Sequence, residues 1–235
     1  MSAPAAGHVA LDPADFDSVA IYKLMTGIVV PRPIAWISTV GAGPAERGDA
    51  RDEGGADRAG LVNLAPFSAF TMVANDPPMV GINIGLRRGA AKDTGRNIDE
   101  TGEFVVNIAD WALRDRVHES AREFAYDEDE TRILGLATVP SDLVAPPRLE
   151  QAPISLECRL SRRIEFGRAG AQFTVGEVVR FHVRDGLLRD GKIDTVELDP
   201  LLRLGGPNYA RLGDVDRLAP LTVSVSTRAE RADAN

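Results

Sequence analysis

Short apolar runs bounded by Gly, Pro, Asn or Asp recur from about residue 34 to residue 108. Runs of this length with such residues at their ends are typical of β-strands. Two later runs alternate between apolar and polar residues, the period-two pattern of a strand with one buried face. The pattern predicts strands at Ile34–Val40, Leu61–Leu64, Ser68–Val73, Val80–Ile84, Phe104–Ile108, Ile154–Ser161 and Phe173–Val183.

The last of these segments alternates most clearly. Val175, Val179, Phe181 and Val183 are predicted to share one face with Glu177. A carboxyl group among apolar neighbours is a candidate catalytic acid, although paired structural carboxylates are commoner. The other face then holds Thr174, Arg180, His182 and Arg184, so His182 is expected to be a strand residue facing a polar layer.

Fewer segments have a helical pattern. Thr94–Thr101 is followed by Gly102, a residue favoured just after the end of a helix. Trp111–Ser120 and Pro200–Leu204 are the other predicted helices. The strands follow one another without a helix between each pair, which favours an antiparallel β-barrel with peripheral helices over a doubly wound parallel sheet.

The domain organisation follows from three segments that do not have the pattern of packed structure. Residues 1–13 are small and polar and residues 228–235 are charged and Ala-rich, so both are expected to be loose termini. Residues 41–60 contain six Gly among Arg, Asp and Glu. This segment exceeds the usual hairpin connection of ~2–5 residues, so we expect an inserted mobile loop in a single domain over 14–227.

Composition excludes several classes of protein. The net charge of -8 and the pI near 5.0 argue against nucleic-acid binding, which needs a basic face. Cys158 is the only cysteine, so neither an intrachain disulfide nor a cysteine-ligated cluster can form. No window approaches the ~20 apolar residues of a membrane span, and the first residues do not resemble a signal peptide. The expected location is the cytoplasm.

Three motifs in the first half contain the candidate chemistry. Asn-Leu-Ala-Pro-Phe-Ser-Ala-Phe (Asn63–Phe70) is followed by Asn-Asp-Pro-Pro-Met (Asn75–Met79) and Lys-Asp-Thr-Gly-Arg-Asn-Ile (Lys92–Ile98). A helix N-terminus attracts anions through its free N–H groups and its dipole. Small polar side chains beside a Lys-Asp-Thr step at a predicted helix start therefore favour a site for a phosphorylated ligand.

Three further motifs accompany these: Arg-Pro-Ile-Ala-Trp-Ile-Ser-Thr-Val (Arg32–Val40), Thr-Gly-Glu-Phe-Val-Val-Asn (Thr101–Asn107) and the Pro-Leu-x-Arg-Leu-Gly-Gly-x-x-Tyr segment ending at Tyr209. Together the six motifs resemble the flavin reductase-like family of FMN-binding split β-barrels, which includes the flavoredoxins. The similarity runs from about Tyr22 to Tyr209, with the motifs in the family's order. It implies a Greek-key antiparallel barrel, usually a homodimer, with FMN near the subunit interface.

The resemblance also implies a set of cofactor-binding residues. Backbone amides and small hydroxyls would line the flavin, and Ser68, Lys92 and Thr94 would reach its phosphate. The expected residues are Arg32, Trp36, Ile37, Ser38, Thr39, Asn63, Leu64, Ala65, Pro66, Phe67, Ser68, Lys92, Thr94 and Asn97.

Two of these assignments have alternatives. Lys92 and Arg96 could form a solvated basic face, with Thr94 only capping the helix. Arg32 could contact phosphate or ribityl oxygens, or could pair with an acidic neighbour, because a guanidinium suits either bidentate role.

Other reactive residues have simpler explanations. His8, His118 and His182 lack ligand-spaced partners, so no metal site is expected. No dinucleotide-binding glycine motif follows a strand, no nucleophile elbow is present, and the acidic run Asp127–Glu130 is expected to be a solvated loop. We therefore expect no catalytic side chain, because a bound flavin itself supplies the redox chemistry.

The sequence thus predicts an FMN-binding oxidoreductase, with NADH or NADPH as the hydride donor to flavin N5 and backbone N–H groups of Asn63–Ser68 stabilising the reduced ring. The acceptor would be a small molecule or a partner oxygenase. The alternative is an electron-transfer protein resembling flavoredoxin, with tightly bound FMN and no strong NAD(P)H activity. A homodimer is expected in either case, because Phe67, Phe70, Met72 and Met79 would otherwise expose apolar surface near the cofactor.

Overall fold

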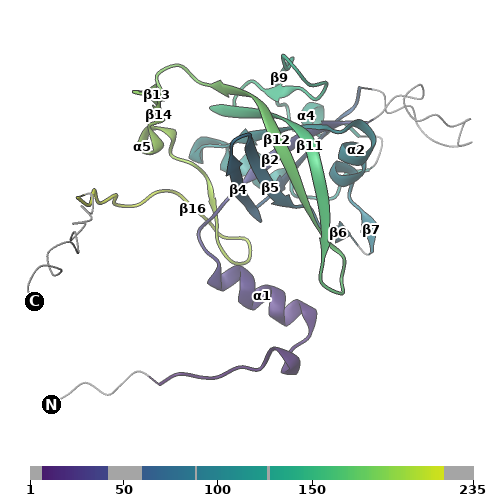
Figure 1. Ribbon diagram of the computed structural model, residues 1–235, viewed down its shortest axis with the longest axis vertical. Coiled ribbons are helices and arrows are strands. Elements are labelled where there is room, and N and C mark those ends of the chain that lie inside the picture. Colours follow the sequence, from purple (N-terminus) through teal and green to yellow (C-terminus); the bar gives the residue numbers. More distant parts are fainter. Residues whose placement is uncertain (1–6, 42–59, 88, 126–127, 220–235) are drawn as a thin grey trace, which may run out of the picture.

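The computed structural model describes residues 7–41, 60–87, 89–125 and 128–219 (Figure 1). The helices are α1 (Ser18–Ile28), α2 (Asp93–Thr101), α3 (Arg114–Glu119), α4 (Glu130–Ile133) and α5 (Thr195–Leu198), with 3-10 turns at Pro13–Asp15 and Trp111–Leu113. The strands are β1 (Arg32–Pro33), β2 (Ala35–Val40), β3 (Val62–Phe67), β4 (Phe70–Asn75), β5 (Pro78–Asn83), β6 (Leu86–Arg87), β7 (Ala90–Ala91), β8 (Glu103–Ile108), β9 (Thr138–Val139), β10 (Arg148–Leu149), β11 (Ile154–Phe166), β12 (Ala171–Val183), β13 (Leu188–Arg189), β14 (Lys192–Ile193), β15 (Leu202–Arg203) and β16 (Tyr209–Ala210). Within these ranges no helix is both long and apolar enough to cross a membrane.

One antiparallel sheet of seven strands dominates the molecule, in the order β3-β2-β8-β11-β12-β5-β4. Its two edge strands, β3 and β4, follow each other along the chain with only Ser68 and Ala69 between them. Two residues span at most ~7 Å beyond the strand ends, so the sheet must curl until its edges meet. The predicted mainly-β antiparallel barrel is confirmed.

All seven predicted strands are present. Ser68 was predicted to begin the third strand, but it lies in the bend that joins β3 to β4. Only the ends of the predicted 41–60 loop, Gly41 and Gly60, lie within the described residues, as do residues 7–13 of the N-terminal segment. The C-terminal segment 228–235 lies outside them.

The predicted face assignment of β12 is wrong across a β-bulge, although His182 is, as predicted, a strand residue on a polar face, beside Ser155 and Glu157. Glu157 of β11 pairs with Arg180, but the next residue, Cys158, pairs with Val178, so Val179 is an extra residue. A bulge of this kind reverses the alternation of side chains along the strand. Val178 therefore faces the core and Val179 does not, while Glu177 lies on the opposite face from Val183 and lines neither of the hollows described below.

Two apolar clusters cover the two faces of the sheet. The cluster inside the barrel includes Ile37, Phe67, Phe104, Cys158 and Ile98 of α2. Burial, followed by the nearby charge of Glu157, raises the pKa of the Cys158 thiol, so this cysteine is a core residue and not a nucleophile.

The second cluster packs Trp36, Leu64 and Val117 between the outer face of the sheet and the turns around α3 and α4. The Trp36 indole Nε1 donates to Ser120 Oγ at 2.8 Å, so its polar atom is satisfied in the buried site.

The helices differ from the sequence predictions at four places: α1, α4 and α5 were not predicted, and the predicted helix Pro200–Leu204 is absent. Helix α1 was not predicted, although Ile21, Leu24, Met25 and Ile28 recur at the i, i+3, i+4 and i+7 spacing of an amphipathic helix. The predicted helix Pro200–Leu204 is wrong: Leu201 N donates to Ala109 O at 2.9 Å, and strand β15 pairs with β1, so these backbone groups bond to other segments. The helical turn in this region is α5, just before it.

The barrel interior provides the first prediction. A Cβ on Gly176 would overlap the ring of Phe104, a fully buried side chain that has no space to move. Overpacking of this kind costs about 1–3 kcal/mol, so Gly176→Ala should lower the free energy of unfolding by that amount in urea titrations. The matched control is Gly213→Ala, where no atom lies within 4 Å of the added Cβ. Equal stability of both variants would contradict the packing described here.

Candidate functional site

The N-terminus of α2 has backbone donors without helical acceptors. The first intrahelical bond is Arg96 N to Lys92 O at 3.0 Å, so the N–H groups of Asp93, Thr94 and Gly95 have no partner within the helix. Lys92 occupies the cap position, and its side chain has no oxygen to accept from them. The dipole and the free donors together make this end of α2 suited to an anion.

Two side-chain hydrogen bonds attach α2 to the barrel. Asn97 Nδ2 donates to Thr39 Oγ1 of β2 at 3.0 Å, and Asn63 Nδ2 of β3 donates to Thr94 Oγ1 at 2.8 Å. All four side chains are buried. Because the Thr94 oxygen accepts from Asn63 and donates to none of the described residues, its hydroxyl proton is available to a ligand.

Lys92 is a half-buried cation that forms no ion pair within the described part of the chain. Its Nζ lies 5.2 Å from the centroid of the Phe67 ring, and Arg87 is nearby. Burial first, and then the charge of Arg87, lower the pKa of Lys92. An anion at this position would supply the missing counter-charge.

A small hollow lies in front of these groups. Its walls include Asn63, Lys92 and Thr94 on one side and Ser120, Phe124 and Glu130 on the other, with Arg87 and Arg122 at its margin. Arg122 lies over the Phe124 ring at 4.4 Å. The volume is about 30 Å³, enough for a small polar group only, so the body of a larger ligand would lie across the surface.

The acidic run at the start of α4 was predicted to be a solvated loop, and this prediction is wrong for Asp129 and Glu130, although Glu128 is exposed. Asp129 and Glu130 are buried, and they accept from the outer edge of β3. Val62 N donates to Asp129 Oδ2 at 3.4 Å and Leu64 N to Glu130 Oε2 at 3.2 Å. Strand β3 therefore has its exposed edge satisfied by carboxylates. Asp127 lies outside the described residues.

This edge limits which backbone groups of the Asn63–Ser68 segment can reach a ligand. Alternate N–H groups of a strand point to opposite edges, so the outward positions here are Leu64, Pro66 and Ser68. Leu64 already donates to Glu130, and proline has no N–H. Among these strand positions no outward N–H remains for a ligand, and Ser68, in the bend after β3, is the next residue that has one.

The structure brings together Asn63, Lys92 and Thr94, but not every residue expected beside them. Ser68 is five residues from Asn63 along extended chain, about 16 Å, and does not line the hollow. Ala65 and Leu64 line the hollow, Asn97 and Thr39 bond to each other, and Phe67 contributes its ring under Lys92. The side chains of Trp36, Ile37, Ser38 and Pro66 lie away from it, and Ser38 Oγ donates to Pro147 O at 2.6 Å.

Arg32 has contacts that neither expected alternative describes. Its Nη1 donates to the carbonyls of Thr26 (2.7 Å) and Val29 (2.6 Å) at the end of α1, and its Nη2 to Leu204 O at 2.9 Å. Its Nε lies 3.4 Å from Ser68 Oγ. The guanidinium thus joins the C-terminus of α1 and β15 to the β3–β4 bend.

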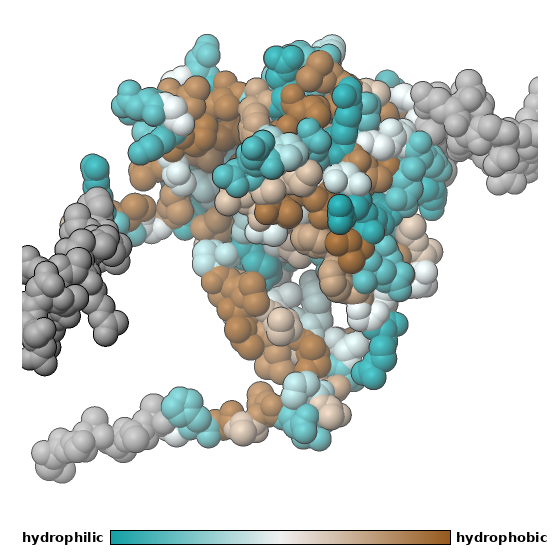
Figure 2. Space-filling model, viewed as in Figure 1, coloured by the Kyte–Doolittle hydropathy of each residue, from teal (hydrophilic) through white to brown (hydrophobic). Residues whose placement is uncertain are grey.

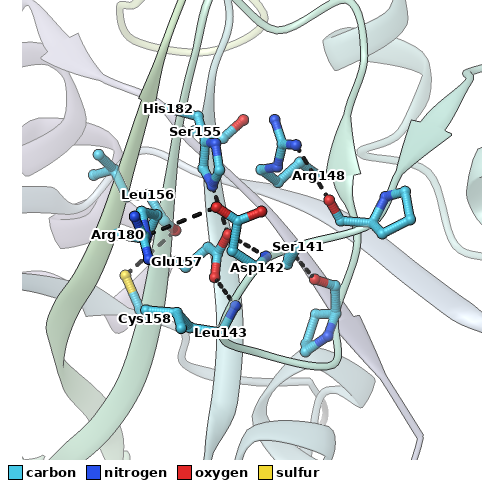
Figure 3. A network of polar contacts seen from close by, with 12 residues as sticks. Ser141, Asp142, Leu143, Arg148, Ser155, Leu156, Glu157, Cys158, Arg180 and His182 are labelled. Atoms are coloured by element: carbon cyan, nitrogen blue, oxygen red, sulfur yellow. Dashed lines mark hydrogen bonds and ion pairs between the residues drawn. The ribbon is translucent and has the colours of Figure 1, made fainter.

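A second polar network, on the other side of the sheet, was not found from the sequence (Figure 3). Glu157, fully buried, accepts from His182 Nε2 at 2.5 Å, Asp142 N at 2.8 Å and Leu143 N at 2.7 Å. Burial alone would raise the pKa of Glu157, but these hydrogen bonds outweigh it and the pKa is lowered. The register of the β11–β12 hairpin places Ser155 opposite His182. Glu157 is two residues from Ser155 on the same face of β11, so it is a diagonal neighbour of His182, and this register would have revealed the Glu157–His182 pair.

Potential ligand atoms of Asp142, Glu157 and His182 all lie within 4.8 Å of one another, an arrangement that the sequence spacing did not predict. Both oxygens of Glu157 already accept hydrogen bonds. A metal ion would have to displace them, so the structure favours a hydrogen-bonded pair over a metal centre here.

The lowered pKa of Glu157 gives a pH prediction. Its stabilising contribution is fully present above its unfolded pKa of about 4.5 and is lost as the pH falls through the lower folded value. Glu157→Gln should therefore be about 2 kcal/mol less stable than wild type at pH 7, and the difference should shrink below pH 4.5. Denaturant titrations from pH 7 to 3 measure this, with the surface variant Glu197→Gln as the control. A stability difference between Glu157→Gln and wild type that stays constant with pH would contradict the lowered pKa of Glu157.

Comparisons with known proteins agree with this architecture. Residues 26–203 match the family model described as Flavin reductase like domain. An uncharacterised protein of Halalkalibacterium halodurans is 36% identical over 219 residues, covering 91% of this chain and 97% of that protein. The crystal structure of nitrilotriacetate monooxygenase component B from Bacillus cereus has a TM-score of 0.80 at 33% identity, covering 91% of this chain and 100% of that chain. The crystal structure of the 2-nitrobenzoate 2-nitroreductase of Pseudomonas fluorescens has a TM-score of 0.72 at 32% identity, covering 93% of this chain and 100% of that chain. The chain belongs to the flavin reductase-like family.

Proposed function

We propose that this protein binds FMN with the phosphate at the N-terminus of α2 and acts as an NAD(P)H-dependent flavin reductase. The observation that supports this most strongly is Lys92, a half-buried cation without an ion-pair partner among the described residues, beside the free N–H groups of α2. The Thr94 hydroxyl supplies a short donor in the same hollow. A dianionic phosphate fits this set of donors.

The rest of the cofactor would lie across the surface, because the hollow has room only for the phosphate. Ser68 would serve the ring end of FMN rather than its phosphate, since it lies just after the far end of β3 from Asn63. Arg32 holds the Ser68 hydroxyl in place at 3.4 Å. Bound FMN would supply the redox chemistry, accepting hydride from NADH or NADPH.

The similarity to a monooxygenase component favours a partner oxygenase as the consumer of the reduced flavin. The alternative, an electron-transfer protein that holds FMN tightly, predicts that NADH and NADPH leave the visible flavin absorption unchanged. A reductase predicts bleaching within seconds of mixing. The spectrum of the purified protein with each nucleotide therefore separates the two functions.

We also propose a homodimer, in which α1 contributes the interface. No residue of α1 is buried, and Val19, Tyr22, Met25 and Ile28 are all more than half exposed. Figure 1 shows α1 projecting from the barrel, and in Figure 2 hydrophobic residues gather in that region of the surface. A helix that exposes apolar side chains to water is unfavourable, so a second protein surface is expected to pack against it.

The four residues first expected to need a partner are mostly covered by the barrel itself. Phe67 is buried and Phe70 packs on the interior core, while Met72 remains 78% exposed on β4. Because Arg32 ties the end of α1 to Ser68, an interface on α1 would adjoin the ring end of the proposed flavin site.

The phosphate site is tested by Lys92→Met, which removes the charge but keeps an apolar stem against Phe67. FMN affinity should fall by about 1.5–3 kcal/mol, the range of a charge-assisted hydrogen bond, while riboflavin affinity barely changes. The unliganded variant should be as stable as wild type or more stable, because a desolvated charge beside Arg87 is removed.

Fluorescence titration with both flavins and thermal melts of the apo protein measure these effects. Lys192→Met, at an exposed lysine of β14, is the matched control and should change neither affinity. Equal losses for FMN and riboflavin in Lys92→Met would rule out a phosphate contact.

The dimer is tested by Met25→Glu on α1, with Lys23→Glu as a control at an exposed polar position of the same helix. Sedimentation velocity at micromolar concentration should show a dimer for wild type and for the control, and a monomer for Met25→Glu, because a charge in an apolar interface is costly. A wild-type monomer that binds FMN fully would refute the shared interface.

A further inference from the structure

A second hollow lies on the outer face of the sheet, where β9 and β10 cover the ends of β11 and β12. Its volume is about 560 Å³, within the ~300–1,000 Å³ typical of small-molecule sites. No residue that lines it also lines the hollow at α2. Polar groups come from Arg148, His182 and Arg184, and apolar walls come from Val139 and Pro153.

Arg148 is the most informative residue of this second hollow, which is called the groove from here on. Its guanidinium donates through Nη2 to Pro140 O at 3.2 Å, and its Nε is buried without a hydrogen-bond partner. Among the described residues it forms no ion pair with any carboxylate. A guanidinium presents donors in a planar fork that matches a carboxylate, so an anionic ligand would satisfy the remaining donors.

His182 provides a second, oriented polar group. The buried carboxylate of Glu157 holds its Nε2 at 2.5 Å, which fixes the ring, and its Nδ1 has no hydrogen-bond partner in the described structure. Figure 3 shows the His182 ring, Ser155 and the Arg148 guanidinium on the same side of the network. The Ser155 hydroxyl is already used, since it donates to Asn107 Oδ1 at 2.9 Å.

The acidic groups around the groove do not neutralise Arg148. Glu157 accepts three hydrogen bonds, Asp142 lies 3.8 Å from Arg180, and Asp110 lies 3.5 Å from Arg184. Each of these carboxylates therefore has a basic or donor group of its own, although Asp110 Oδ1 is buried without a hydrogen-bond partner. Of the residues that line the hollow itself, Glu150 is acidic, and it is exposed.

We propose that this groove is a second ligand site, separate from the flavin hollow, which takes a small organic carboxylate. The carboxylate would bind the Arg148 guanidinium, and the apolar body of the ligand would lie against Val139, Pro153 and the His182 ring. This site rests on its own residues and does not depend on the proposed flavin reductase activity.

Calorimetric titration with benzoate tests the proposal, with neutral benzamide as the matched probe. Benzoate should bind saturably with one site per chain, about tenfold more tightly than benzamide, and equally well with and without saturating FMN. Arg148→Gln should weaken benzoate binding about tenfold. The exposed residue Arg162, about 24 Å further along β11 than Ser155, gives the control Arg162→Gln, which should bind within twofold of wild type.

The Arg148 Nε–H resonance in ¹⁵N NMR of the unaltered protein gives a second measurement that does not depend on the variant folding. Benzoate should shift this signal strongly. The proposal is overturned by any of four results: no saturable binding, equal affinity for benzoate and benzamide, displacement of benzoate by FMN, or a bound state with the Arg148 signal unmoved.

Discussion

The structure depends on the two-residue connection between β3 and β4. These strands are the opposite edges of a seven-stranded sheet, yet only Ser68 and Ala69 separate them. The sheet must therefore close on itself, and the aromatic residues on either side of the bend, Phe67 and Phe70, pack on the core inside. Closure removes most of the free sheet edge, and the buried carboxylates of Asp129 and Glu130 satisfy the part of β3 that remains.

Closure of the barrel also fixes the position of the candidate site at the N-terminus of α2. Helix α2 is attached to the barrel by the Asn63–Thr94 and Asn97–Thr39 hydrogen bonds, so its N-terminus faces a fixed wall of β3 and not a loop. Lys92 is held there with a charge that the unliganded fold disfavours. A bound anion would supply the counter-charge that Lys92 lacks among the described residues, and this is the basis of the proposed phosphate site.

The sequence predicted the seven main strands and α2 correctly, because their periodicity and the left-handed Gly102 at the helix end are local features. The motif resemblance also placed Asn63, Lys92 and Thr94 in one site. The Glu157–His182 pair depends on hairpin register and on a bulge at Val179, which composition does not reveal. Helix α1 had a helical spacing of apolar residues that the sequence analysis did not use. The carboxylates of Asp129 and Glu130 had the composition of a solvated loop, although they accept hydrogen bonds from backbone N–H groups of β3.

The most direct test of the account is a crystal structure of the protein with FMN. The phosphate oxygens should lie within hydrogen-bond distance of the Thr94 hydroxyl, the Lys92 Nζ and at least one free N–H at the start of α2. The ring should extend along β3 toward Ser68. FMN bound with its phosphate elsewhere, and the N-terminus of α2 left to solvent, would contradict the central claim.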